Sequence, residues 1–270
     1  MTEITFGQYY AGNSFLHKMD ARMKLVLTFA LIVVVFLCKS FFSLGLMLLA
    51  TAAAVLLSTV PVKMIFKSLK PIAVILVFTA ILNLFYAKGG AVYFKWRFIE
   101  LTEKGVNTAI FMAVRIVILV VISSLLTYTT TPTSLTDAME RLLSPLRIFK
   151  IKVHTLAMMM TLALRFIPTL IEEIERIMNA QKARGAELET GNLAARAKAL
   201  VPIFVPLMVS SFRRAYELAF AMTCRGYTGG EGRTRMKQMK LGIRDYAALL
   251  AVMAVVAGII LLNIYFKAVI

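Results

Sequence analysis

Residues 25–60 read LVLTFALIVVVFLCKSFFSLGLMLLATAAAVLLSTV, a nearly continuous apolar run. A helix crosses a membrane in roughly 20 residues, so this run is too long for a single span. Polar residues interrupt it only around Lys39-Ser40 and at Ser43. We therefore expect a tight hairpin of two transmembrane helices over residues 25–38 and 43–60.

Other parts of the chain also contain apolar runs long enough to suggest membrane spans. Pro71, which suits the first turn of a helix, starts an apolar run that ends before Gly89-Gly90. Further runs predict spans over 71–87, 106–128 and 246–266, which makes five. Since 60% of the 270 residues are apolar and the mean hydropathy is +0.79, an ordinary soluble domain is a poor description. The predicted fold class is an all-α polytopic membrane protein.

Changes in polarity divide the chain into four parts. Residues 1–24 are a polar, interfacial segment that lacks the pattern of a cleaved signal peptide. Residues 25–128 form a four-helix membrane part. Residues 129–245 form a cytoplasmic insert, which opens with a Thr-rich helix stop and N-cap cluster. Residues 246–270 hold the last transmembrane helix and the C-terminus.

Shorter segments connect these elements. We expect a basic loop over 61–70 and a mixed loop over 88–104, whose aromatic residues favour the bilayer interface. In the insert, a polar amphipathic helix over 134–144 should precede an apolar stretch over 153–164. That stretch is too short to cross a membrane and suits a packed or interfacial helix.

The insert contains two further amphipathic helices that end in the same way. Apolar residues recur at helical spacing in each, with charged residues on the opposite face. The first helix ends in Ala183-Arg184-Gly185 and the second in Cys224-Arg225-Gly226. Gly191-Asn192 and Pro202 are expected to interrupt the chain between them.

Two interpretations of these Arg-Gly pairs remain open. At a helix C-terminus a cation is favoured, and a glycine permits a left-handed cap, so one pair alone is explained by capping. Two copies on the same insert favour a docking function. Arginine pairs with a carboxylate through two hydrogen bonds, and each of Arg184 and Arg225 could hold its helix in a groove of a partner.

The net charge of +17 is explained by the orientation of the spans rather than by nucleic acid. With the N-terminus in the cytoplasm, most basic residues near span ends lie on the inner side. The inner flanks carry Lys18, Arg22, Lys24, Lys63, Lys67, Lys70, Arg141, Arg147, Lys150, Arg225, Arg233, Arg235, Lys237, Lys240 and Arg244. The outer flanks carry Lys39, Lys88, Lys95, Arg97, Lys104 and Lys267.

The sequence offers little chemistry of its own. The glycines at 229–232 lack the lysine of a phosphate-binding loop, so we do not expect ATP hydrolysis by this chain. His17 and His154 lie far apart, as do Cys38 and Cys224, and we assign no catalytic, metal or cofactor site. Arg115 and Asn83 lie inside predicted spans. Arg115 either faces a partner or the bundle, or extends its charge to the interface.

Several motifs resemble a known membrane family. They are Gly7-Gln8-Tyr9 with Gly12 and Ser14, Leu16-His17, Asp20 with Arg22 and Lys24-Leu25, Leu164-Arg165-Phe166-Ile167-Pro168, Ala180-Gln181-Lys182-Ala183-Arg184-Gly185, Phe212-Arg213-Arg214-Ala215, and Arg225-Gly226-Tyr227. Together they resemble the transmembrane T component of energy-coupling factor (ECF) transporters, the EcfT/CbiQ family. The departures are Ala21, where the family usually has proline, and Cys224, where it has alanine.

The resemblance implies a function that the composition does not reveal. It implies a non-catalytic scaffold in a prokaryotic plasma membrane, in complex with two ABC-type ATPases and a substrate-binding S component. It also implies that Ala183-Arg184-Gly185 and Cys224-Arg225-Gly226 contact the ATPases, and that the S component delivers a vitamin or a metal ion. The alternatives are a T subunit dedicated to one substrate (cobalt, nickel or biotin), a membrane-embedded enzyme, and an adaptor that binds lipid through the basic insert.

Overall fold

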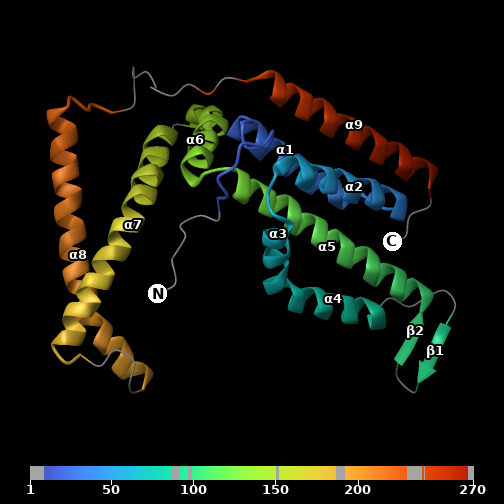
Figure 1. Cartoon of the computed structure of the whole chain (residues 1–270), viewed down its shortest axis with the longest axis horizontal. Helices are drawn as coiled ribbons and strands as arrows, with labels where there is room; N and C mark the ends of the chain where they lie inside the picture. The colour runs from blue at the N-terminus through green and yellow to red at the C-terminus, as the bar shows by residue number, and fades with distance from the viewer. Residues whose placement is uncertain are drawn as a thin grey trace. The chain divides into compact units, whose positions relative to one another are not determined.

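The computed structural model describes residues 9–86, 92–96, 99–149, 152–186, 192–229, 239 and 241–266 (Figure 1). The chain forms two compact units, one made of residues 1–138 and 238–270 and the other of residues 139–237. Nearly all of the described chain is helical, which confirms the predicted fold class.

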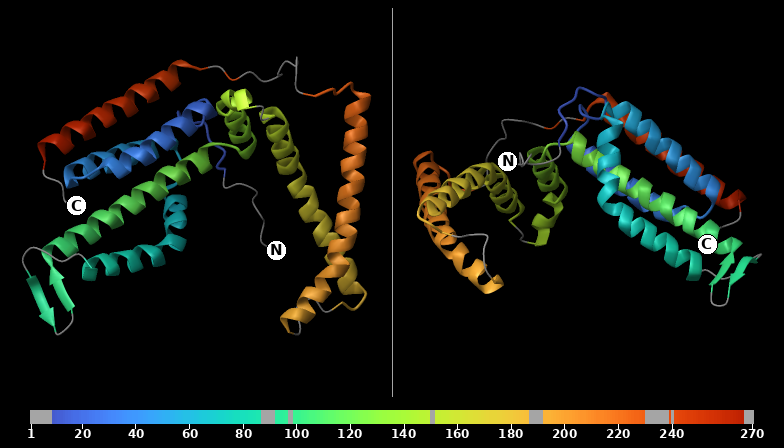
Figure 2. Two further views of the ribbon diagram at one scale, coloured as in Figure 1. Left: turned by 180° about the vertical axis from the view of Figure 1, so that it is seen from behind. Right: turned by 60° about the horizontal axis from the view of Figure 1, so that its bottom comes forward.

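Four long helices of the first unit share one hydrophobic core. They are α1 (Ala21–Leu37), α2 (Phe41–Ser58), α5 (Glu103–Thr129) and α9 (Ile243–Tyr265), and they run alongside one another in both figures of the whole chain (Figures 1 and 2). The buried side chains at their centre are Val34, Val35, Cys38, Leu44, Met47, Phe111, Ile118, Ile122 and Ile259.

The predicted hairpin of α1 and α2 is confirmed. The two helices are joined through Cys38, Lys39 and Ser40, and Ser40 is the N-cap of α2. The Ser40 hydroxyl accepts a hydrogen bond from the backbone N–H of Ser43 at 3.2 Å. The polar residues that interrupt the apolar run therefore mark the start of α2, where the chain reverses direction and packs in the same hydrophobic core as α1.

The predicted basic loop over 61–70 was wrong, because these residues are helical. Helix α3 (Val62–Leu69) follows Pro61, and a 3-10 turn, η1 (Lys70–Ile72), leads into α4 (Ala73–Tyr86). Three lysines suggested a loop, but residues 62–69 contain neither glycine nor proline, and Ile65 packs in a small buried cluster. Helix α4 packs along α5.

The expected mixed loop over 88–104 contains a β-hairpin. Strand β1 (Val92–Trp96) pairs in antiparallel fashion with β2 (Ile99–Thr102), and Lys95 lies opposite Glu100. The aromatic residues that suggested a bilayer interface also favour strands. The hairpin is a short addition to a helical protein.

Five helices are long and apolar enough to cross a membrane within the described residues: Phe41–Ser58, Val62–Phe85, Glu103–Thr129, Val153–Ala183 and Ile243–Tyr265. The set differs from the five spans expected from the sequence. It includes the helix that begins at Val153, and it omits α1, which has 17 residues. Because α1 contributes buried residues to the core shared by α2, α5 and α9, we treat it as part of the membrane bundle.

The second unit contains a pair of long helices. The chain passes through α6 (Pro132–Leu142) and a 3-10 segment, η2 (Ser144–Phe149), into α7 (Val153–Ala183) and α8 (Leu193–Cys224). A short separate helix over 153–164 and a break at Pro202 were both wrong predictions. Helix α7 continues through Pro168, and α8 continues through Pro202 and Pro206. A proline removes only one backbone hydrogen bond, and the packing of α7 against α8 helps to offset that loss.

Candidate docking site

Helix α7 ends in a backbone motif that requires glycine. Gly185 has a φ of 83°, in the left-handed region. Its N–H donates to the carbonyl of Lys182 at 3.0 Å, and the N–H of Ala186 donates to the carbonyl of Gln181 at 3.0 Å. These two bonds define a Schellman motif, with Arg184 as the C-cap residue.

Helix α8 ends in the same motif. Gly226 has a φ of 69°. Its N–H donates to the carbonyl of Thr223 at 2.9 Å, and the N–H of Tyr227 donates to the carbonyl of Met222 at 3.0 Å. Arg225 therefore holds the position in α8 that Arg184 holds in α7.

The fold explains the glycines but not the arginines. A Cβ atom at Gly185 or Gly226 would meet nothing within 4 Å, so backbone conformation rather than space selects glycine at both positions. Arg184 and Arg225 are both exposed, as are Ala183 and Cys224. In the described part of the chain neither guanidinium has a side-chain hydrogen bond or an ion pair, and backbone groups alone complete the caps. The arginines are therefore available to another molecule.

The two arginine ends lie at opposite ends of an antiparallel helix pair. Near the end of α7, the Gln181 amide donates to the carbonyl of Pro202, at 3.5 Å, in the first third of α8. Just beyond the end of α8, the Tyr227 hydroxyl contacts the sulfur of Met158, in the second turn of α7, at 2.9 Å. The structure therefore keeps Arg184 and Arg225 apart and presents them separately.

An ion pair that sequence reasoning missed joins the middle of the two helices. Arg214 of α8 donates to the carboxylate of Glu173 of α7, and both side chains are partly buried. The amphipathic pattern placed both residues on charged faces but gave no sign that these faces meet. The pair fixes the register of α7 against α8, and with it the separation of the two arginine ends.

A second missed cluster fastens the start of α9 to the start of α1. Asp245, only 3% exposed, accepts hydrogen bonds from the N–H of Asp20 at 2.9 Å and of Gly242 at 2.7 Å. Arg22 donates twice to the Asp20 carboxylate, at 2.8 and 3.1 Å, and once to the carbonyl of Met239, at 3.1 Å. Arg22 precedes the apolar run of α1, and its hydrogen bond to Asp20 raises its pKa.

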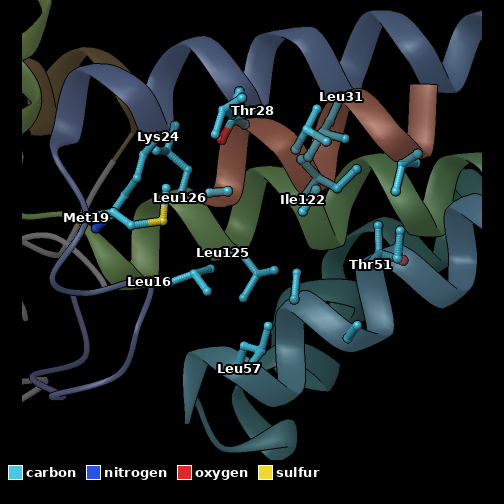
Figure 3. A pocket seen from close by; sticks show the side chains of 18 of the residues that line it. Leu16, Met19, Lys24, Thr28, Leu31, Thr51, Leu57, Ile122, Leu125 and Leu126 are labelled. Atoms are coloured by element: carbon cyan, nitrogen blue, oxygen red, sulfur yellow. The ribbon is translucent and has the colours of Figure 1, made fainter. Parts of the chain in front are cut away.

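A cavity of about 410 Å³ opens among α1, α2, α5, α9 and the segment before α1 (Figure 3). The amine of Lys24 at its edge donates to the carbonyl of Thr129 at 2.8 Å, so it caps the C-terminus of α5. The hydroxyls of Thr51 and Thr129 donate to carbonyls of their own helices. The remaining wall is almost wholly apolar, which suits an apolar occupant and not a charged solute.

The Arg115 side chain reaches the turn between α1 and α2. Its guanidinium donates to the carbonyl of Cys38, just beyond the end of α1, at 2.6 Å, and lies 4.7 Å from the centre of the Phe111 ring. Asn263 of α9 donates to the neighbouring carbonyl of Leu37 at 2.8 Å. Arg115 therefore stabilises the turn between α1 and α2 by capping a helix, as the dipole of α1 favours.

We expect Arg115→Leu to destabilise the first unit. It removes a charge-assisted hydrogen bond to a helix-end carbonyl, a change worth about 1.5–3 kcal/mol. Thermal unfolding of the detergent-solubilised full-length chain should show a lower midpoint. Arg165→Leu, which makes the same change at an exposed position of α7, is the control. Equal midpoints for the two variants would contradict the capping function.

The histidines and cysteines have local roles. The His17 ring is hydrogen-bonded to the Ser14 hydroxyl at 2.6 Å and to the carbonyl of Tyr10 at 2.8 Å, and His154 contacts Glu140 at 3.0 Å. Cys38 is buried and Cys224 is exposed, and neither forms a disulfide. Among the residues that the structure describes, no three His, Cys, Asp or Glu side chains are grouped to hold a metal ion.

Comparison with known proteins points to one family. Residues 12–237 match the family model CbiQ, described as cobalt transport protein. A protein of Ruminiclostridium cellulolyticum is 51% identical over 238 residues, covering 88% of this chain and 89% of that protein. A protein of Clostridium kluyveri is 49% identical, and the match covers 97% of this chain and 98% of that protein. A protein of Bacillus subtilis is 42% identical, and the match covers 95% of this chain and 97% of that protein. All three are named energy-coupling factor transporter transmembrane protein EcfT.

Proposed function

Because this chain belongs to the family of energy-coupling factor transporter transmembrane proteins, the T components of these transporters, we propose that it couples ATP hydrolysis by two ATPase subunits to substrate uptake through a membrane S component. The first unit would be the membrane scaffold. The pair of α7 and α8 in the second unit would be the coupling element that receives motion from the ATPases.

One observation carries the proposal: Arg184 and Arg225 are exposed, repeat the same cap geometry and form no side-chain hydrogen bond or ion pair with the residues that the structure describes. A planar guanidinium at a rigid helix end is suited to two parallel hydrogen bonds with a carboxylate. Because the two ends lie apart, each would dock in a groove of a different ATPase subunit. Ala183, Gly185, Cys224 and Gly226 would line the contacts beside them.

The proposed orientation places the N-terminus and the insert over 129–245 in the cytoplasm of a prokaryote, where ATP is available. The excess of basic residues near the inner span ends supports it. Cys224 offers a direct test, because it is exposed on the second unit while Cys38 is buried. When the chain is produced without its ATPase partners, which would cover Cys224, a thiol reagent that does not cross membranes should label inside-out vesicles and leave intact cells unlabelled. The opposite pattern would reverse the orientation.

The chain would have no catalytic site of its own, and ATP hydrolysis would belong to its partners. The substrate, a vitamin or a metal ion, would be selected by the S component. The wall of the cavity in the first unit is apolar and has few groups that could bind a charged solute, which supports substrate selection by the S component. Whether the chain serves one S component or several depends on its partners.

The decisive experiment is recovery of the full-length chain from native membranes in mild detergent, followed by identification of its partners by mass spectrometry. We expect ATPase subunits and at least one small membrane protein. Several different small membrane proteins would indicate a shared T component, and a single one a dedicated subunit. Recovery without any ATPase would contradict the proposal.

A further inference from the structure

Helix α3 runs in a different direction from the helices next to it. In Figure 1 and in both views of Figure 2, α4 and α5 run alongside each other, whereas α3 runs across them between the end of α2 and the start of α4. By themselves its eight residues (Val62–Leu69) would span only about 12 Å, and α3 reaches the length of a membrane span only when it is counted together with η1 and α4 as Val62–Phe85. A helix so placed at the end of a membrane bundle suits the interface between hydrocarbon and water.

One side of α3 is attached to the end of α5. Ile65 is 6% exposed and packs in a cluster with Val60 and Tyr128. The hydroxyl of Tyr128, the second-last residue of α5, donates to the carbonyl of Met64 at 3.2 Å. These contacts fix which faces of α3 point away from the protein.

The outward faces carry two adjoining stripes. Val62 and Phe66, one helical turn apart, are 52% and 67% exposed. Lys63, Lys67 and Lys70 recur at helical spacing beside them, and all three are exposed. The sequence contains no aspartate or glutamate between Asp20 and Glu100. Within the described residues, none of the three lysines forms an ion pair.

We propose that α3 is an anchor for anionic phospholipids. Phe66 and Val62 would enter the outer part of the hydrocarbon, and the three ammonium groups would bind headgroup phosphates. The exposed apolar surface continues along the chain on both sides, through Leu56 and Leu57 of α2 and Val74 and Ile75 of α4. Lipid covers such a surface in a membrane bundle, and the lysines select the anionic headgroups. The inference is independent of the docking of Arg184 and Arg225.

A fluorescence quenching experiment with the full-length chain tests this anchor. Val62→Cys carries the fluorophore in a Cys224→Ala background, since the remaining Cys38 is buried. The protein is reconstituted in phosphatidylcholine bilayers with the same small fraction of nitroxide-labelled phosphatidylglycerol or nitroxide-labelled phosphatidylcholine. We expect several times stronger quenching by phosphatidylglycerol, since each lysine near the surface contributes roughly fivefold in affinity. High salt should weaken the preference.

Two variants and a second reporter complete the design. Replacing Lys63, Lys67 and Lys70 by glutamine should remove the preference, and replacing them by arginine should keep it. A reporter at Phe78→Cys, 60% exposed on α4, should be quenched by both lipids alike. Equal quenching of the α3 reporter by the two lipids would overturn the proposal. Absence of quenching at α3 by either lipid, with normal quenching at Phe78→Cys, would mean that protein or water covers α3 and would overturn it as well.

Discussion

The Arg184→Glu/Arg225→Glu double variant is expected to remain in the membrane and to lose its ATPase subunits. Both arginine side chains are exposed, and the described caps at the ends of α7 and α8 are completed by backbone groups alone, so the fold should survive. Each replacement puts a negative charge opposite the partner carboxylate that we propose. Removing one member of a desolvated charge pair costs about 2–5 kcal/mol, and two such losses exceed what most remaining contacts can hold.

Copurification of the ATPases with the full-length subunit measures this loss. Arg176→Glu/Arg213→Glu is the matched control, because it places the same charge change at exposed arginines on the same two helices, away from the caps. The control should retain the ATPases. Full recovery of the ATPases with the double variant would reject docking through these arginines.

The single variants carry further information. Because the arginines lie at opposite ends of the helix pair, Arg184→Glu and Arg225→Glu should each weaken one contact and leave the other in place. Their effects on the affinity should be close to additive, as for distant sites without shared partners. A loss in one variant as complete as in the double variant would indicate a single shared contact.

The second large effect is expected for Asp245→Ala. This substitution removes a buried carboxylate that accepts from the N–H groups of Asp20, which is partly buried, and of Gly242, which is exposed. Water can replace the acceptor of the exposed Gly242 N–H, so we expect a cost of about 1–3 kcal/mol, the penalty for one unsatisfied buried donor. Loss of the aspartate also removes a negative charge near Lys24 and Arg22.

Two measurements test this: the midpoint of thermal unfolding of the purified full-length subunit, and the amount of the subunit recovered in the membrane. Asp245→Asn keeps one side-chain oxygen and should be intermediate. Glu103→Ala, an exposed carboxylate at the start of α5, should lower stability by less than about 1 kcal/mol through the helix dipole. If Asp245→Ala were no less stable than Glu103→Ala, Asp245 would not hold the start of α9 to α1.

The fold was predictable wherever length and polarity decide it. The run over 25–60 must double back because no single helix of that length fits a bilayer, and Ser40 marks the place. Polarity misled at α3, whose lysines resemble a loop although one face of the helix packs on α5. The break expected at Pro202 is absent as well, because packing between α7 and α8 outweighs the local cost of proline.

The candidate site was predictable only in its local part. The helix ends at Arg184-Gly185 and Arg225-Gly226 follow from neighbouring residues, and the structure has both caps. Contacts between residues distant in the chain leave no periodic signal. The pairing of Glu173 with Arg214 and the contacts of Asp245 with Asp20 therefore became visible only once the helices were placed.

The antiparallel packing of α7 and α8 has a consequence for the composition of the complex. Two helices of 31 and 32 residues that cross antiparallel, each ending in the same arginine cap, are related by an approximate local twofold axis. One asymmetric chain thus presents a nearly symmetric pair of ends. A pair of ATPase subunits related by a twofold axis could bind both ends equivalently, so one copy of this chain per ATPase dimer would complete the assembly.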